Sequence, residues 1–249
     1  MSGKALKIDL RRARILEILA REQQVTVARL SQALDATTVT IRTDLAALER
    51  ENRLRRVRGG AVPAGPEADY GNCTQEKAAI GRALAERIRE GERLFINSGS
   101  TSRAAAAALR RFQRLSVVTN SPAVAGMLCD RFRVVLLGGS MSPGGGFTSG
   151  EDTLNQLERY QTDWALLSVD SISAAEGVAI GHPEESSVSR RMLERAARGV
   201  ILADHTKVGR AGFVRVCDAA PPLMLATSRE ADAWELDALR AAGVEVLTG

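Results

Sequence analysis

The sequence predicts an α/β protein with two domains: an N-terminal winged helix-turn-helix and a larger C-terminal α/β domain with a mainly parallel sheet. Three observations lead to this prediction. The first 60 residues combine three amphipathic helical patterns with a basic hairpin pattern. Later in the chain, helical patterns alternate with short continuous apolar runs, which are typical of parallel strands covered by helices on both faces. Positive charge is also concentrated in the first part of the chain.

The composition is that of an ordinary globular protein. The chain has 249 residues, of which 45% are hydrophobic and 26% are charged. It has no apolar run of about 18 residues and no signal-peptide pattern, so we expect a cytoplasmic protein with no membrane partner. Its cysteines, Cys73, Cys129 and Cys217, lack the paired spacing of a zinc or redox site, so we expect reduced thiols, no metal and no cofactor.

The two parts of the chain differ in charge. Residues 1–60 hold 13 Lys and Arg against 7 Asp and Glu, a net charge of +6, whereas the remainder holds 21 against 23, a net charge of −2. Lys and Arg that neutralise phosphates supply most of the sequence-independent affinity for DNA. A solvated basic surface would show the same asymmetry, so the charge needs support from a motif.

Three helical patterns occupy the N-terminal part. The first covers residues 9–24, and the second begins near Thr26, a plausible N-cap, and stops at Asp35-Ala36. The third begins at Thr37, and its inward face carries Ile41, Leu45 and Leu48. Its outward face is expected to carry Thr40, Thr43, Ala47 and Arg50.

Three short helices with a tight turn before the third form a helix-turn-helix, whose last helix enters the major groove of DNA. The residues that we expect to reach bases and phosphates are Thr38, Thr40, Arg42 and Thr43. Arg42 has the geometry to bind a guanine edge, whereas threonine contacts phosphates or a thymine methyl group. The alternative is a small helical bundle whose arginines are merely solvated.

A hairpin pattern follows the third helix. Residues 52–62 form two short extended runs around the turn signal Gly59-Gly60. Three arginines on this wing, Arg55, Arg56 and Arg58, are expected to lie against the DNA backbone or the minor groove. We therefore predict a DNA-binding domain at 1–62, a linker at 63–73 and a second domain at 74–249.

The second domain alternates between strand and helix patterns. Strands are predicted over residues 94–96, 115–118, 134–137, 164–169, 200–202, 223–226 and 244–247. Helices are predicted over residues 76–89, 103–111, 123–129, 152–159, 186–197 and 234–242. Ligands of parallel sheets bind beyond the carboxyl ends of the strands, so the residues after each strand are candidates for a site.

The candidates at this edge are small and polar. They are Ser98, Gly99, Ser100, Thr101, Thr119, Asn120, Gly138 and Gly139. Residues 98–101 lead into a helix and offer backbone N–H groups to an anion. With a cation at Lys77 or Lys207 and a carboxylate at Asp170 or Glu184, the edge is suited to a phosphorylated sugar or polyol.

Several stretches resemble the DeoR family of bacterial sugar-metabolism repressors. They are residues 40–45 (TIRTDL), 58–61 (RGGA), 76–77 (EK), 98–101 (SGST), 118–121 (VTNS), 137–139 (LGG), 190–192 (RRM), 203–204 (AD) and 206–207 (TK). The resemblance implies a winged helix-turn-helix and a sensor domain related to ribose-5-phosphate isomerase and CoA transferases. It also implies release of operator DNA when a phosphorylated sugar binds.

Within the family the chain looks most like the repressors of amino-sugar and polyol operons. It departs from the common family pattern at Thr43, Arg58, Asn97, Ser168, Ser171 and Ser189. The first two departures predict an altered operator preference, and the others alter the usual contacts to the effector.

Three hypotheses remain open. The first is an effector-controlled repressor that binds double-stranded operator DNA as a dimer or tetramer. The second is a sugar-phosphate isomerase or CoA transferase, with acid and base supplied from among Asp170, Glu184, Asp204, His205 and Lys207. The third is a constitutive DNA-binding protein whose effector pocket no longer functions.

Overall fold

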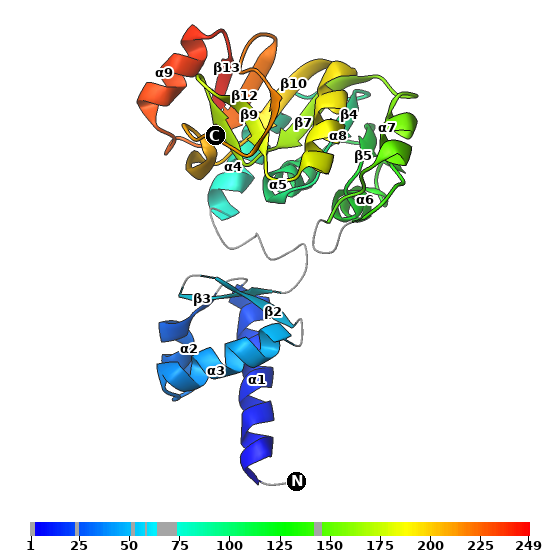
Figure 1. Cartoon of the computed structure of the whole chain (residues 1–249). Coiled ribbons are helices and arrows are strands. Elements are labelled where there is room, and N and C mark those ends of the chain that lie inside the picture. The colour runs from blue at the N-terminus through cyan, green and yellow to red at the C-terminus, as the bar shows by residue number, and fades with distance from the viewer. Residues whose placement is uncertain (1–2, 23–24, 51–52, 58, 64–73, 142–145) are drawn as a thin grey trace. The chain divides into compact units, whose positions relative to one another are not determined.

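A computed structural model describes residues 3–22, 25–50, 53–57, 59–63, 74–141 and 146–249 (Figure 1). The chain folds into two compact units that divide between residues 72 and 73. Of the linker expected at 63–73, all but Pro63 lies outside the described residues, and so does Arg58. In the described part of the chain, no helix is both long and apolar enough to cross a membrane.

The first unit is built from three helices and a small antiparallel sheet. The helices are α1 (Gly3–Glu22), α2 (Val27–Ala33) and α3 (Thr38–Arg50). The strands are β1 (Val25–Thr26), β2 (Leu54–Val57) and β3 (Gly60–Pro63), in the order β1-β3-β2. The predicted N-cap at Thr26 is confirmed, because its Oγ1 accepts a hydrogen bond from the Arg29 N–H at 3.1 Å. Gly60 is required next to β1, because a Cβ there would collide with the carbonyl of Val25.

One apolar cluster joins the three helices and the sheet of this unit. The predicted inward residues Ile41, Leu45 and Leu48 are confirmed as buried. The outward placement of Ala47 is wrong, since only 6% of this residue is exposed. Because α3 packs against α1, α2 and β2, its buried face is wider than one apolar stripe. The first helix also begins at Gly3, six residues earlier than the pattern predicted.

The second unit contains a seven-stranded parallel sheet, as predicted. Its strands are β4 (Arg93–Ile96), β5 (Ser116–Thr119), β6 (Arg133–Leu136), β7 (Thr162–Ser168), β10 (Ala196–Leu202), β12 (Leu223–Thr227) and β13 (Glu245–Thr248). Their order is β13-β12-β10-β7-β4-β5-β6. The chain therefore builds outward from β4 in one direction, and then returns to add β7 and the remaining strands on the other side.

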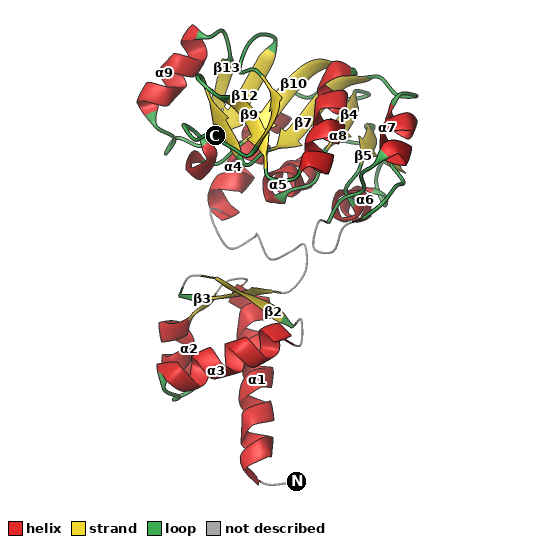
Figure 2. Ribbon diagram, in the orientation of Figure 1, coloured by secondary structure: helices red, strands yellow, loops and turns green. Residues whose placement is uncertain are grey.

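Helices cover both faces of this sheet (Figure 2). One face packs on α4 (Thr74–Ala85), α5 (Ser100–Leu109) and α6 (Pro122–Leu128). The other face packs on α7 (Glu151–Leu157), α8 (Pro183–Glu194) and α9 (Ala233–Ala241). Alternate side chains of β4 belong to different faces, because Leu94 and Ile96 join the first cluster and Phe95 joins the second.

A second, antiparallel sheet was missed by the sequence analysis. It consists of β8 (Ser171–Ser173), β9 (Gly177–Ile180) and β11 (Val214–Cys217), in the order β11-β9-β8. A short 3₁₀ helix, η1 (His205–Lys207), follows β10. The predicted end of the helix over 186–197 is wrong, because α8 ends at Glu194 and β10 begins at Ala196.

Candidate functional site

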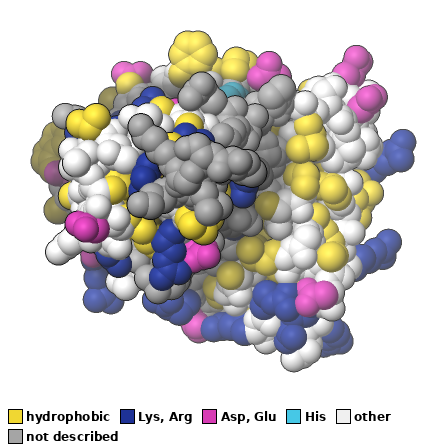
Figure 3. Space-filling model, turned by 90° about the horizontal axis from the view of Figure 1, so that it is seen from below, with side chains coloured by type: hydrophobic (Ala, Val, Ile, Leu, Met, Phe, Trp, Pro, Cys, Tyr) yellow, Lys and Arg dark blue, Asp and Glu magenta, His cyan; other side chains and the backbone are white. Residues whose placement is uncertain are grey.

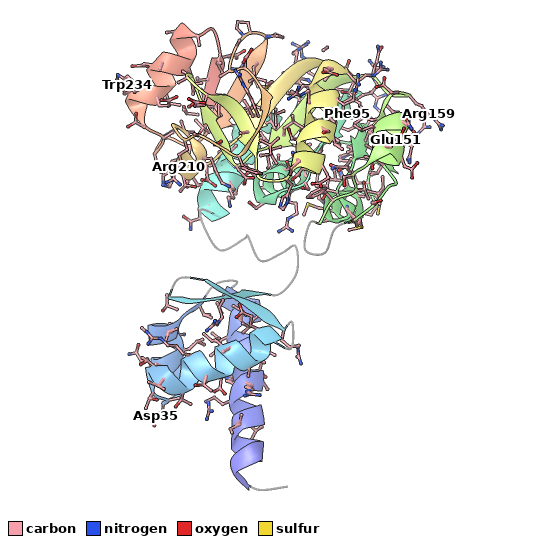
Figure 4. The ribbon with its side chains drawn as sticks, in the orientation of Figure 1. Asp35, Phe95, Glu151, Arg159, Arg210 and Trp234 are labelled. Atoms are coloured by element: carbon pink, nitrogen blue, oxygen red, sulfur yellow. The ribbon has the colours of Figure 1, made fainter. Side chains whose placement is uncertain are left out.

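The N-terminal half of α3 presents polar side chains at the surface. Thr38, Arg42 and Thr43 are exposed, and Thr40 is half-buried. The helix begins after Thr37, whose Oγ1 accepts a hydrogen bond from the Thr40 N–H at 3.2 Å. Asp35, labelled in Figure 4, adopts a positive φ of 47° in the turn between α2 and α3. This turn lets α3 leave α2 at an angle, as a helix-turn-helix requires.

The sequence analysis overlooked one exposed apolar residue of α3. Val39 is 69% exposed although it lies beside the candidate DNA contacts Thr38 and Thr40. A solvent-facing valine at this position offers an apolar contact of the kind that reads a thymine methyl group. The signal was present in the sequence, since Val39 lies two residues before the buried Ile41 and falls outside the apolar stripe.

The wing arginines have different environments. Arg56 donates hydrogen bonds to Glu49 from its backbone N–H at 2.8 Å and from Nε at 2.7 Å. These bonds, the backbone one first, lower the pKa of Glu49. The side chain of Arg55 and the whole of Arg58 lie outside the described residues. Arg42 and Arg56 both line a groove of about 360 Å³ together with Val27, Leu45, Gly59 and Gly60.

A buried acidic residue fixes α3 against α1. Asp44 is 2% exposed, and its carboxylate accepts hydrogen bonds from Arg11 Nε at 2.6 Å and Arg12 Nε at 3.2 Å. These two arginines therefore neutralise a carboxylate of the recognition helix. Figure 3 shows Lys and Arg side chains, in dark blue, at the surface.

The second candidate site lies where the sheet changes its direction of growth. This topological switch point falls between β4 and β7, which are neighbours in the sheet although β5 and β6 come between them in the chain. Ligands of open parallel sheets bind in the crevice at such a point. We call the loops after β4, β7 and β10 the candidate effector site, comprising residues 97–101, 168–170 and 203–207.

The loop after β4 begins α5 at this point. Gly99 precedes the first helical residue and has a φ of 124°, which side-chain-bearing residues rarely adopt. A Cβ at Gly99 would lie 2.6 Å from the Cβ of Ser168, so glycine also permits the close approach of β7. Ser100 and Thr101 are buried in the first turn of α5. The helix start aims backbone N–H groups at the switch point.

A charged side chain of α8 contacts this loop, and an ion pair lies within electrostatic reach of that side chain. Ser98 Oγ donates a short hydrogen bond to Glu185 on α8. Asp170, which follows β7, accepts hydrogen bonds from Lys207 Nζ at 3.1 Å and from the Gly181 N–H at 2.7 Å. The predicted candidates Ser98, Asp170 and Lys207 therefore belong to one cluster, in which Asp170 also acts on Glu185 electrostatically.

The two carboxylates at the start of α8 have different surroundings. Glu184, the candidate chosen from the sequence, is exposed, whereas its neighbour Glu185 is 7% exposed and faces Ser98. The pKa of Glu185 is raised to about 7, mainly by burial and further by the charge of Asp170, whereas the hydrogen bond from Ser98 lowers it. Helical spacing carried the signal, because the buried face of α8 also includes Val188, Ser189 and Met192.

The loop after β10 is held by an ion pair between Lys77 and Asp204 and by hydrogen bonds to Glu76. Lys77 Nζ on α4 lies 3.6 Å from Asp204 Oδ2, and both side chains are almost fully buried. Glu76 Oε1 accepts hydrogen bonds from the backbone N–H of His205 at 3.1 Å and from Ser228 Oγ. It also lies 2.7 Å from His205 Nδ1. Lys77 is therefore held against a carboxylate, while Lys207 is half-buried and reaches Asp170.

Three of the departures from the common DeoR pattern contact one another. Asn97 Nδ2 donates to the Ser168 carbonyl at 2.9 Å and to Ser189 Oγ at 3.3 Å. Asn97 Oδ1 accepts from the Ser168 N–H and from Ser102 Oγ, both at 2.8 Å. Asn97, Ser102 and Ser189 are fully buried. The four residues form a neutral hydrogen-bonded network that includes two residues of the candidate effector site, Asn97 and Ser168.

The remaining candidates lie at the ends of β5 and β6. Asn120 Nδ2 donates to the Thr148 carbonyl at 3.1 Å, while its buried Oδ1 has no hydrogen-bond partner within the described ranges. Thr119 Oγ1 accepts from the Ser121 N–H at 3.0 Å. The Gly138 N–H donates to Gln156 at 3.0 Å, and Gly139 is exposed with a φ of 135°. In the described part of the chain, the hydrogen bonds of these residues do not reach the cluster of Ser98, Asp170 and Lys207.

The residues that the structure describes include no group of three or more His, Cys, Asp or Glu side chains placed to hold a metal ion. The cations of the candidate effector site are lysines, and its anions are Asp170, Glu185 and Asp204. This arrangement is suited to binding a small anion with hydroxyl groups through N–H donors, a cation and carboxylate acceptors.

Comparison with known proteins identifies both units. A model described as the DeoR-like helix-turn-helix domain matches residues 11–65, and the DeoR C terminal sensor domain matches residues 72–229. The HTH-type transcriptional repressor GlcR of Bacillus subtilis is 32% identical, over 94% of this chain and 93% of the relative. The glycerol-3-phosphate regulon repressor of Haemophilus influenzae is also 32% identical, over 85% of this chain and 86% of the relative.

Solved structures resemble the fold only distantly. A ribose 5-phosphate isomerase from Methanocaldococcus jannaschii superposes with a TM-score of 0.41 and 13% identity, covering 55% of each chain. A similarity of this size carries no argument about the chemistry of the site.

Proposed function

The chain belongs to the DeoR family of transcriptional regulators, and from this premise we propose that it represses a carbohydrate operon until a phosphorylated sugar or sugar alcohol binds its C-terminal domain. The two relatives described above are named as repressors, one of them of a glycerol-3-phosphate regulon. The enzymatic hypothesis is set aside, because the matching relatives are transcriptional repressors and not enzymes.

DNA binding is assigned to the first unit. In this proposal Thr38, Arg42 and Thr43 of α3, which are exposed, and the half-buried Thr40 enter the major groove. The wing arginines Arg55, Arg56 and Arg58 are proposed to contact the DNA backbone, and of their side chains the structure describes that of Arg56, which is exposed. A palindromic operator requires a dimer or a tetramer, whose two-fold symmetry matches the two half-sites. Because a DNA-binding repressor acts where the bacterial DNA lies, we expect the protein in the cytoplasm.

Effector binding is assigned to the switch point between β4 and β7. The observation that carries this assignment is that Glu185 links the start of α5 to an ion pair of two other loops. Glu185 is hydrogen-bonded to Ser98 and is acted on by the charge of Asp170, which pairs with Lys207. In this proposal the phosphate binds N–H groups of residues 98–101, and Asp170 and Lys207 bind the sugar hydroxyls. A ligand that binds the DNA-free conformation more tightly must weaken operator binding by the same free energy.

The proposal is tested by adding sugar phosphates to the full chain. A thermal-shift panel identifies those that bind, because a ligand of the native state raises the unfolding midpoint. Fluorescence anisotropy with the DNA upstream of the protein's own gene then measures operator affinity with and without the ligand. We expect the binding ligand to weaken operator affinity by about 5-fold to 150-fold.

The variant for this test is Lys207→Ala. It should blunt the response to the ligand while leaving the operator affinity of the ligand-free protein unchanged, because Lys207 pairs with Asp170 in the second unit. The matched control is Arg210→Ala, which removes an exposed cation three residues further along (Figure 4). A protein that binds operator DNA but no sugar phosphate would instead be a constitutive DNA-binding protein.

A further inference from the structure

A buried carboxyl group lies directly beside the proposed phosphate site. Glu185 is the third residue of α8, and its side chain accepts a hydrogen bond from Ser98 Oγ. Ser98 is the first residue of the loop whose N–H groups face the switch point. Among the residues that the structure describes, Ser98 is the side chain that hydrogen-bonds to Glu185, and no cation lies within ion-pair distance of the Glu185 carboxylate.

The charges around Glu185 do not neutralise it. Asp170 is the charged group that acts on it, and Lys207 lies 3.1 Å from Asp170. Charged groups on the elements packed against α8 have partners elsewhere. Arg215 on β11 pairs with Asp218, and Glu158, which follows α7, pairs with Arg191 and Arg195. Asp163 on β7 pairs with Arg93, and Arg198 on β10 lies over the Trp164 ring. Glu151 and Asp152 of α7 are exposed to water.

These surroundings oppose the negative form of Glu185. Burial removes water from the carboxylate, and the neighbouring charge of Asp170 repels it, so that its pKa is raised to about 7. The hydrogen bond from Ser98 and the position in the first turn of α8 both favour the ionised form, but they do not outweigh burial. Near neutral pH the ligand-free protein therefore contains both forms of the side chain.

We propose that Glu185 contacts the effector itself, and that its neutral carboxyl group donates a hydrogen bond to the bound phosphate. The inference rests on the proposed function, since it requires an anion on the loop 98–101. An ionised Glu185 carboxylate, hydrogen-bonded to Ser98 Oγ, repels an anion that is bound by the adjacent N–H groups. A neutral Glu185 carboxyl group instead donates a hydrogen bond to that anion. Binding of the effector therefore takes up a proton.

The sign of the pH dependence follows from this uptake. The bound anion raises the pKa of Glu185 further above 7, so the complex holds more protons than the free protein. Affinity is then greatest below pH 7 and falls as the pH rises through 7, by up to about tenfold per pH unit. The loss ends once the pH passes the pKa of Glu185 in the complex.

Sulfate is the probe that isolates the protein's own titration. A phosphate monoester changes its charge near pH 6, whereas sulfate remains a dianion throughout the range from pH 6 to 8.5. Isothermal titration of the full chain with sulfate measures both the dissociation constant and the number of protons exchanged. Two buffers of different ionisation enthalpy, used at each pH, give the proton number for the wild type without any variant.

For the wild type we expect proton uptake at pH 7 and a dissociation constant that rises several-fold between pH 7 and 8. In Glu185→Gln the amide keeps a donor and does not titrate, so both the uptake and the pH dependence should disappear. The matched control is Glu184→Gln, which removes the exposed neighbour and should behave as the wild type does. Ser98→Ala removes a bond that favours the ionised form, so it should move the pH midpoint upward.

The outcomes separate this inference from the proposed function. Sulfate binding without proton uptake, or a pH dependence that persists in Glu185→Gln, would overturn the role of Glu185 and leave the phosphate site intact. If the wild type bound neither sulfate nor any sugar phosphate at any pH, the site and the inference would fail together.

Discussion

The contact between Asp44 and α1 gives a specific prediction about the DNA-binding unit. The Asp44 side chain is 3% exposed and accepts hydrogen bonds from Arg11 at 2.6 Å and Arg12 at 3.2 Å. Asp44 lies on α3, and both arginines lie on α1. The carboxylate therefore holds α3 against α1.

The change to test is Asp44→Asn, which keeps the shape of the side chain and removes its charge. A hydrogen bond to a charged group contributes roughly 1.5–3 kcal/mol. Because the two arginines are about one-quarter exposed, solvent screening reduces their contribution, and the asparagine retains part of the hydrogen bonding. We expect the free energy of local unfolding of α1 and α3 to fall by about 2 kcal/mol. This corresponds to about 30-fold faster exchange of their amide hydrogens with solvent.

Hydrogen exchange of the full chain, measured on peptides from α1 and α3, is the assay. The control is Glu17→Gln, which makes the same change of charge on α1 at an exposed residue that pairs with Arg14, and it should alter exchange by less than about threefold. Equal exchange rates in the two variants would refute the conclusion that Asp44 holds α3 against α1.

Three further predictions concern ligand and DNA binding. Glu49→Gln should release Arg56 for the DNA backbone. In anisotropy titrations, the slope of the logarithm of the operator binding constant against the logarithm of the salt concentration should then steepen by about 0.9. An unchanged slope would mean that Arg56 remains away from phosphate. Arg42→Ala should cost about 1–3 kcal/mol at the operator and relax base discrimination there, whereas Arg14→Ala on α1 should cost far less. Gly99→Ala should weaken sugar-phosphate binding at least about tenfold without loss of operator affinity, because its φ of 124° is strained for alanine and the added Cβ would lie 2.6 Å from that of Ser168. Wild-type thermal shifts in Gly99→Ala would exclude the loop 98–101 as the phosphate site.

Local patterns were sufficient to predict the helix-turn-helix and the parallel sheet. The spacing of Ile41, Leu45 and Leu48 determines which face of α3 packs inward, and hence that Thr43 faces outward. Continuous apolar runs such as that around Trp164 mark strands buried on both faces. Both signals depend on residues a few positions apart, which a single sequence displays directly.

Features that depend on distant residues were not predicted. The sheet of β8, β9 and β11 joins strands of three or four residues, and β9 pairs with β11 more than 30 residues later. The hydrogen bond between Asn97 and Ser189 spans 92 residues. No local period reveals that two such polar residues will be buried together, because each alone has the composition of a loop or a helix surface.

The choice between Glu184 and Glu185 illustrates the same limit at a single position. Adjacent carboxylates lie about 100° apart on a helix, so the phase of α8 decides which one is buried. Val188 and Met192 carry that phase, but the helix was predicted over residues 186–197, so both glutamates lay before its expected start, whereas α8 begins at Pro183. The structure places Glu185 inside because Ser98, from the loop after β4, gives it a hydrogen-bond partner.

The most direct test of the account is operator affinity as a function of salt, measured by anisotropy on the full chain with and without the sugar phosphate that stabilises it. We expect the operator affinity to fall steeply as the salt concentration rises. At every salt concentration it should be lower still when the sugar phosphate is present. An affinity insensitive to both salt and sugar phosphate would contradict it.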